Sequence, residues 1–170
     1  MRRRLNMMAL VTLALTGCDD RPLSGPPELR LGRDECAECG MLIDDDRSAC
    51  AVLVDDRGLR SHLLFDDLGC LLDHEREGLD GRTVVERFAR DYETRAWVPA
   101  ELAHYIVAPS DELPTPMGSG LAAFAARDDA ERAALARQGR VVDLSGLIRA
   151  RLDWKEARRA ARERQAPKTP

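Results

Sequence analysis

The sequence ACAVLVDDRGLRSHLLFDD, residues 49–67, predicts a β-hairpin that leads directly into a helix. Residues 49–54 are a short apolar run typical of a strand, and residues 59–65 form a second strand candidate. The four residues between them, Asp55-Asp56-Arg57-Gly58, favour a tight turn. The pair Asp66-Asp67 can then cap a short helix that extends to about residue 75. A further strand is expected over residues 83–92.

The second half of the chain repeats this order of elements. Strands are expected at residues 103–108 and 120–125, a helix capped by Asp128-Asp129 runs to about residue 138, and a short strand covers residues 140–143. We therefore predict an α+β fold of two small tandem ββαβ units, residues 34–95 and 96–145. A C-terminal helix with a basic tail follows at residues 146–170. The two halves share element order rather than residues, so internal duplication and coincidence both stay open.

The N-terminal residues have the pattern of a bacterial lipoprotein signal. Three arginines at positions 2–4 precede an apolar stretch, and Leu15-Thr16-Gly17-Cys18 resembles a lipobox. We predict that residues 1–17 are removed, that Cys18 carries the lipid, and that residues 18–33 form a flexible tether. Asp19-Asp20 after the cysteine favours retention at the inner membrane. The alternative is an ordinary secretory signal with an incidental cysteine.

Charge excludes one class of partner. The whole chain carries a net charge of −4, and without residues 1–17 it has 23 basic and 30 acidic side chains, a net charge of −7. Nucleic-acid binding draws its affinity from excess positive charge, so we expect no nucleic-acid partner. No apolar run is long enough to span a bilayer, and we expect membrane contact through the lipid anchor.

Four cysteines follow the tether: Cys36, Cys39, Cys50 and Cys70. In an oxidising compartment the default is two disulfides, with three possible connectivities. Cys36-Ala37-Glu38-Cys39 could equally be a redox pair or half of a zinc site. No helix cap follows this CxxC segment, which weakens the redox interpretation.

Two methionines lie in loop-like, glycine-flanked settings: Met41 in Cys39-Gly40-Met41, and Met117 in Pro116-Met117-Gly118. A thioether binds Cu(I) well and zinc or magnesium poorly. It also survives in an oxidising compartment, where thiols form disulfides. Sulfurs from two loops could therefore converge on one Cu(I) ion, although a single methionine is more often a core residue.

The ordered set of motifs resembles the NosL family. It consists of Cys39-Gly40-Met41, then the segment 64–70 (LFDDLGC), then the segment 116–124 (PMGSGLAAF). The resemblance implies a copper-binding lipoprotein of the periplasmic side that assists maturation of nitrous oxide reductase. It also implies a fold of paired ββαβ units related to organomercurial lyase.

The same resemblance implies the site residues. Cys39 and Met41 match the expected Cu(I) ligands, Met117 matches a third ligand or gate, and Cys36 is either a fourth sulfur or a structural thiol. Asp66 and Asp67 are expected to cap a helix, with contact to a partner or support of the metal ligands as a further role. His62 is expected on a strand face, although an imidazole could complete a copper site; His104 is interpreted in the same way.

We predict a metallochaperone without enzymatic activity, on the periplasmic face of the inner membrane. It would accept Cu(I) from a membrane exporter and deliver it to nitrous oxide reductase, with the reductase's maturation ABC transporter as a further partner. A copper chaperone for a different acceptor stays open, and two alternatives of another class remain. One is a thiol-dependent lyase or disulfide-handling enzyme, and the other is a structural lipoprotein stapled by Cys36–Cys39 and Cys50–Cys70.

Overall fold

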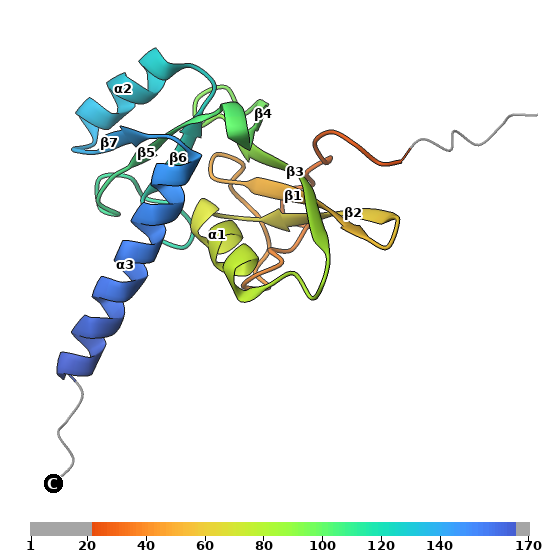
Figure 1. Ribbon diagram of the computed structural model, residues 1–170. Coiled ribbons are helices and arrows are strands. Elements are labelled where there is room, and N and C mark those ends of the chain that lie inside the picture. Colours follow the sequence, from red (N-terminus) through yellow and green to blue (C-terminus); the bar gives the residue numbers. More distant parts are fainter. Residues whose placement is uncertain (1–21, 166–170) are drawn as a thin grey trace, which may run out of the picture.

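The computed structural model describes residues 22–165 and contains two antiparallel sheets with three α-helices (Figure 1). The first sheet has the strand order β2-β1-β3-β4, and the second has the order β6-β5-β7. The elements are β1 Cys50–Asp56, β2 Leu59–Phe65, α1 Leu68–Glu77, β3 Thr83–Arg90, β4 Trp97–Pro99, the 3-10 helix Ala100–Leu102, β5 His104–Val107, β6 Leu121–Phe124, α2 Arg127–Ala136, β7 Arg140–Val142 and α3 Leu144–Gln165. The expected α+β fold of two tandem ββαβ units is confirmed. The expected signal peptide and lipidated Cys18 lie outside the described residues.

The hairpin β1–β2 forms where its sequence predicts it, although Asp55 and Asp56, which were expected in the turn, belong to β1. Arg57 and Gly58 have φ angles of 54° and 93°, and Asp56 pairs with Leu59, so the turn has two residues that both adopt positive φ. Turns of this kind match the right-handed twist of the strands they join. Strand β1 lies between β2 and β3, and its first five residues are buried. This position explains the unbroken apolar run that precedes the turn.

Strand β4 extends the first sheet beyond the predicted hairpin and β3. Its three residues pair with Phe88, Ala89 and Arg90 of β3. A segment this short has no periodicity to recognise, because strand signals need at least four alternating residues. Its place is decided by the neighbouring strand rather than by its own sequence.

The two faces of the first sheet have different neighbours. Val52 and Val54 on one face belong to the main core, which also contains Leu71 of α1 and Tyr105 of β5. Leu53, one residue away, lies on the opposite face, since successive side chains of a strand alternate. The main core therefore lies between the first sheet and α1 and continues into the second unit.

Asp91 joins the two sheets. It is 1% exposed and follows β3, where it forms a bridge to Ala123 of β6. Its carboxylate accepts hydrogen bonds from Thr94 N, Thr94 Oγ1, Glu93 N and, at 2.7 Å, Ala125 N. Burial raises the pKa of Asp91, but these hydrogen bonds outweigh it and hold the pKa below its usual value.

Two details of the helices differ from expectation. Helix α2 begins at Arg127 after Ala126, which makes no side-chain capping bond, so Asp128 and Asp129 lie in the first turn rather than at the cap. Carboxylates there still stabilise the positive end of the helix. In α1, Asp67 alone is the N-cap; it accepts a hydrogen bond from Gly69 N. Asp66 lies outside the helix and is free to point elsewhere.

Residues from 23 onward, within the stretch expected to be a tether, contact the first sheet. Arg60 Nη1 donates to Leu23 O at 3.1 Å, and Gly25 N donates to Glu86 Oε2 at 2.9 Å. His62 Nε2 lies 2.8 Å from Gly25 O. His62 pairs with Leu53 across β1–β2, so it lies on the sheet face opposite α1.

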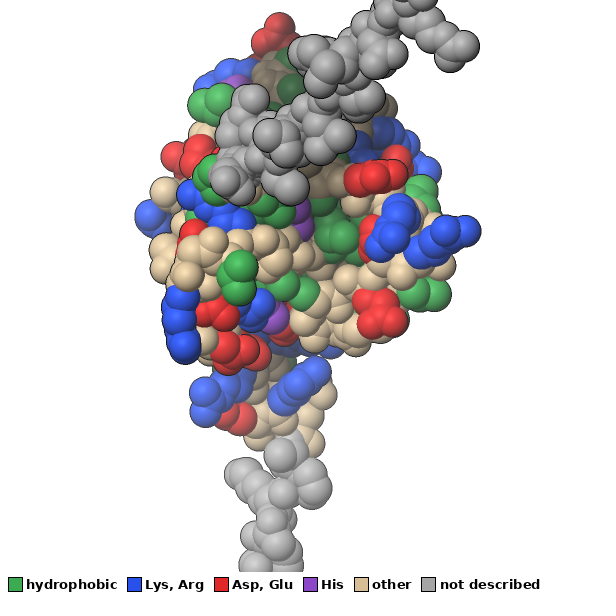
Figure 2. Space-filling model, turned by 90° about the vertical axis from the view of Figure 1, so that its right-hand side faces the viewer, with side chains coloured by type: hydrophobic (Ala, Val, Ile, Leu, Met, Phe, Trp, Pro, Cys, Tyr) green, Lys and Arg blue, Asp and Glu red, His purple; other side chains and the backbone are tan. Residues whose placement is uncertain are grey.

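Helix α3 runs beside α1 and then extends beyond the rest of the molecule (Figure 1). Leu147 and Ala150 are buried, and Arg151 and Lys155 both form ion pairs of 2.9 Å with Asp73 of α1. No helix within residues 22–165 is long and apolar enough to cross a membrane. Acidic and basic side chains are interspersed on the face shown in Figure 2.

Candidate metal centre

Four side chains that can bind a metal meet near the start of α1. Their ligand atoms all lie within 4.8 Å of one another, and we call these residues the thiol cluster: Cys36, Cys39, Asp66 and Cys70. Every cysteine in residues 22–165 is a free thiol, so the pairs Cys36–Cys39 and Cys50–Cys70 of the structural alternative are absent. Cys50 lies on β1, fully buried in the core and outside the cluster.

A tight loop brings Cys36 and Cys39 to this place. Cys36 N donates to Met41 O at 2.8 Å, and Gly40 N donates to Cys36 O at 2.8 Å. Gly40 has a φ of 73°, a conformation that side-chain-bearing residues rarely adopt. Ala37 N donates to Leu64 O at 2.8 Å, which docks the loop onto β2. The loop buries Cys36, at 2% exposure, and leaves Cys39 half-buried.

The start of α1 supplies the other two members. Asp66 directly follows β2, and Cys70 lies in the first helical turn, where its amide donates to Asp67 O at 3.0 Å. The N-terminus of a helix carries a partial positive charge that favours anions such as thiolates. Both side chains are buried, with exposures of 2% and 5%.

The three thiols of the cluster differ in their pKa values. A hydrogen bond from Cys70 lowers the pKa of Cys36 to about 4, against the opposing effect of burial, and the backbone amide of Cys39 contributes. The same contact with Cys36, together with burial, raises the pKa of Cys70 far above that of an ordinary thiol. Burial raises the pKa of Cys39 as well. Cys36 is therefore the thiol of the cluster that most readily loses its proton.

Asp66 has a buried carboxylate that is only partly hydrogen-bonded. Its Oδ2 accepts a hydrogen bond from Cys39 Sγ at 3.7 Å, while Oδ1 is buried and has no partner among the described residues. Burial, followed by the neighbouring Cys36, raises the pKa of Asp66 to about 6. A buried oxygen without a partner costs free energy that a bound cation would recover.

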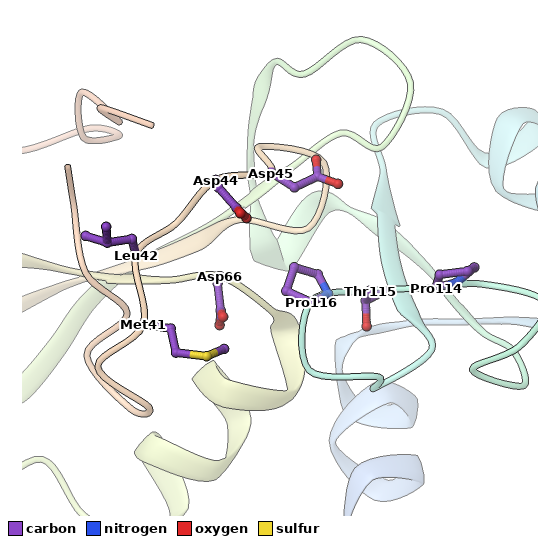
Figure 3. Close-up of a pocket in the computed structure, with 8 residues that line it drawn as sticks. All are labelled: Met41, Leu42, Asp44, Asp45, Asp66, Pro114, Thr115 and Pro116. Atoms are coloured by element: carbon purple, nitrogen blue, oxygen red, sulfur yellow. The ribbon is translucent and has the colours of Figure 1, made fainter. Parts of the chain in front are cut away.

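A cleft of about 470 Å³ opens beside the cluster. Met41 and Asp66 lie on one side of it, and the segment Pro114-Thr115-Pro116 lies on the other (Figure 3). The segments that contain Met41 and Met117 thus border the same cleft. Met41 is 46% exposed and Met117 is 43% exposed, so neither methionine fills the core.

The structure groups the expected site residues differently from the sequence interpretation. It places Cys36 and Cys39 together in the thiol cluster and sets Met41 in the cleft beside Asp66. Met117 lies in the facing segment, where its amide donates to Asp67 Oδ2 at 3.3 Å. His62 is not brought to the cluster. Cys70 was not expected as a ligand, although its spacing of four residues from Asp66 on a capped helix start could have indicated it.

Comparison with known proteins supports a family assignment. The family model NosL matches residues 30–151, a range that contains the thiol cluster and both methionines. The crystal structure of the copper chaperone NosL from Shewanella denitrificans is similar in fold, with a TM-score of 0.58 and 20% sequence identity over 73% of this chain and 96% of that chain. No curated protein sequence matches the chain. With about seven tenths of its length matched by the family model, the chain belongs to the NosL family.

Proposed function

We propose that this protein is a copper chaperone that carries Cu(I) as cargo at the thiol cluster. The observation that carries the proposal is the convergence of Cys36, Cys39 and Cys70 with Asp66 within 4.8 Å, next to an open cleft. Thiolates are soft ligands that favour Cu(I). The copper chaperone of similar fold and the family assignment support the same cargo.

Zinc is the competing cargo on chemical grounds. Three thiolates and a carboxylate can also form a tetrahedral zinc site. Met41, at the mouth of the cleft beside Asp66, favours copper, because a thioether is a weak ligand for zinc. A titration must therefore compare the two ions directly.

Release of the ion requires an open approach to the ligands. Cys39 is half-buried and Met41 is exposed, whereas Cys36 and Cys70 are buried. An acceptor protein could add its own sulfur ligand through the cleft while the buried thiols still hold the ion. Transfer then proceeds by stepwise exchange of ligands, with Met41 and Cys39 as the outer donors.

The place of action and the acceptor form the finer part of the proposal. We propose a lipoprotein anchored through Cys18 at the periplasmic face of the inner membrane, on the basis of its N-terminal sequence. We propose nitrous oxide reductase as the acceptor and its maturation ABC transporter as a partner, on the basis of the family. The protein itself has no catalytic role in this proposal.

The test is a competition titration with a chromophoric Cu(I) chelator under anaerobic conditions. Wild-type protein should compete for one Cu(I) per chain, and Cys36→Ser should lose most of that affinity. Cys50→Ala is the matched control, because Cys50 is a buried thiol outside the cluster. Tighter binding of Zn²⁺ than of Cu(I) would refute copper as the cargo. Failure of the loaded protein to metallate apo-nitrous oxide reductase would refute only the proposed acceptor.

A further inference from the structure

The side chain of Asp67 binds a different segment of the chain from the side chain of the adjacent Asp66. It is 0% exposed, and its Oδ1 accepts the capping bond from Gly69 N. Its Oδ2 accepts a hydrogen bond from Thr115 Oγ1 at 2.6 Å and one from Met117 N at 3.3 Å. The N-cap of α1 therefore binds residues 115–119, which we call the methionine loop, across 48 and 50 positions of sequence.

The methionine loop is closed by its own hydrogen bonds. Ser119 N donates to Thr115 Oγ1 at 2.9 Å, and Gly118 N donates to Thr115 O at 2.9 Å. The Thr115 and Ser119 hydroxyl oxygens lie 3.2 Å apart. Thr115 Oγ1 thus accepts a hydrogen bond that closes the loop and donates the hydrogen bond that attaches the loop to Asp67. A change at this one oxygen loosens the loop and its attachment together.

Close packing gives a second, independent sign of this attachment. A Cβ added at Gly69 would lie 2.9 Å from Asp67 Oδ1 and 3.0 Å from Ser119 Cβ. Contacts that short require the neighbouring atoms to move. Glycine at position 69 lets the methionine loop approach the first turn of α1, which also carries Cys70.

We infer that Asp67 is a positioning residue: it fixes the methionine loop against the start of α1 so that Met117 can donate its sulfur to the ion at the thiol cluster. The inference rests on the proposed function and names a residue through which the site is assembled. Asp66 is part of the thiol cluster, and Asp67 binds the methionine loop. Two adjacent residues at the start of α1 thus orient both the cysteine sulfurs and the sulfur of Met117. A flexible exposed methionine would otherwise spread over many rotamers, at an entropic cost to binding.

The experiment measures Cu(I) affinity by chelator competition in Thr115→Val, Met117→Leu and the double variant. Thr115→Val removes the hydroxyl donor and keeps the β-branched shape. The matched control is Thr94→Val, because Thr94 Oγ1 donates to the buried Asp91 Oδ1 at 2.9 Å, and Thr94 does not line the cleft. Both valine variants lose the same kind of bond, so a difference between them reports on the site rather than on stability.

We expect Thr115→Val and Met117→Leu each to weaken Cu(I) binding about tenfold, which corresponds to about 1.4 kcal/mol. The double variant should bind no more weakly than Met117→Leu, and Thr94→Val should bind as wild type does. Should Thr115→Val fail to fold, Ser119→Ala loosens the same loop and is expected to show the same non-additivity with Met117→Leu.

Two results would overturn the positioning role while leaving the chaperone intact. One is Cu(I) affinity in Thr115→Val equal to that of Thr94→Val, and the other is additive losses in the double variant. Wild-type protein that binds Cu(I) no better than Cys36→Ser would instead refute the proposed function, and this inference with it.

Discussion

Replacement of Cys70 by serine tests the composition of the metal site most directly. Serine has nearly the same shape, and its hydroxyl can replace the thiol as a donor to Cys36, so the fold should persist. A hydroxyl is a hard donor with little affinity for Cu(I). Loss of a supporting residue around a metal already costs about 10–100-fold in affinity. Loss of a ligand should therefore cost at least about 100-fold, or about 2.8 kcal/mol.

Proton release gives the same variant a second readout. Because the pKa of Cys36 is lowered while those of Cys39 and Cys70 are raised, Cys39 and Cys70 must lose protons to bind copper as thiolates. Wild type should release more protons per Cu(I) than Cys70→Ser does, since ligands bind in the deprotonated form. Affinity of the wild type should accordingly rise with pH.

The assay is chelator competition for affinity and an indicator dye in weak buffer for protons, with Cys50→Ala as control. Cys50 is fully buried and outside the cluster, so its loss should lower the melting temperature and leave both copper readouts unchanged. Cys70→Ser with an affinity within threefold of wild type and an unchanged proton count would refute Cys70 as a ligand.

Three further predictions follow from the same geometry. Asp66→Asn should stabilise the metal-free protein above pH 6 by up to about 3 kcal/mol and have little effect near pH 4. The reason is that a carboxyl whose folded pKa is raised to about 6 loses its stabilising contribution as pH rises through that value. Equal melting temperatures of the variant and the wild type at pH 8 would contradict this. Asp91→Ala should cost about 3 kcal/mol at pH 7 and progressively less as pH falls through the lowered pKa of Asp91, since it removes several hydrogen bonds to a buried carboxylate. Denaturant titration measures that loss, and Cu(I) affinity should stay unchanged. Met41→Leu keeps the side-chain volume but removes the thioether. Transfer of Cu(I) to an acceptor chelator, measured by stopped flow, should therefore slow severalfold while the melting temperature stays the same. Transfer at the wild-type rate would show that Met41 takes no part in Cu(I) transfer.

Local sequence patterns were sufficient for most of the fold. The apolar run of β1, the two-residue turn at Arg57-Gly58 and the cap at Asp67 are each formed by neighbours in the chain. Such elements depend on strand alternation, turn conformation and capping, all of which are local properties. Strand β4 was missed because its three residues become a strand only by pairing with β3.

The metal site was only partly predictable, for the same physical reason. The CxxC segment and the two glycine-flanked methionines stand out in the sequence, and they indicated soft sulfur chemistry. Their grouping depends on contacts between distant positions: Cys39 meets Asp66 across 27 residues, and Thr115 meets Asp67 across 48.

Cys70 shows most clearly what could not be predicted from the sequence. In the sequence it is one of four thiols that could have formed disulfides, and only its place four residues after Asp66, at the start of a capped helix, distinguishes it from Cys50. The sequence by itself determined the order of elements and the supply of sulfur. Only the tertiary structure decided that Cys70 joins the cluster while Cys50 stays in the core, because the docking of residues 35–42 onto β2 and the direction of α1 set which thiols face each other.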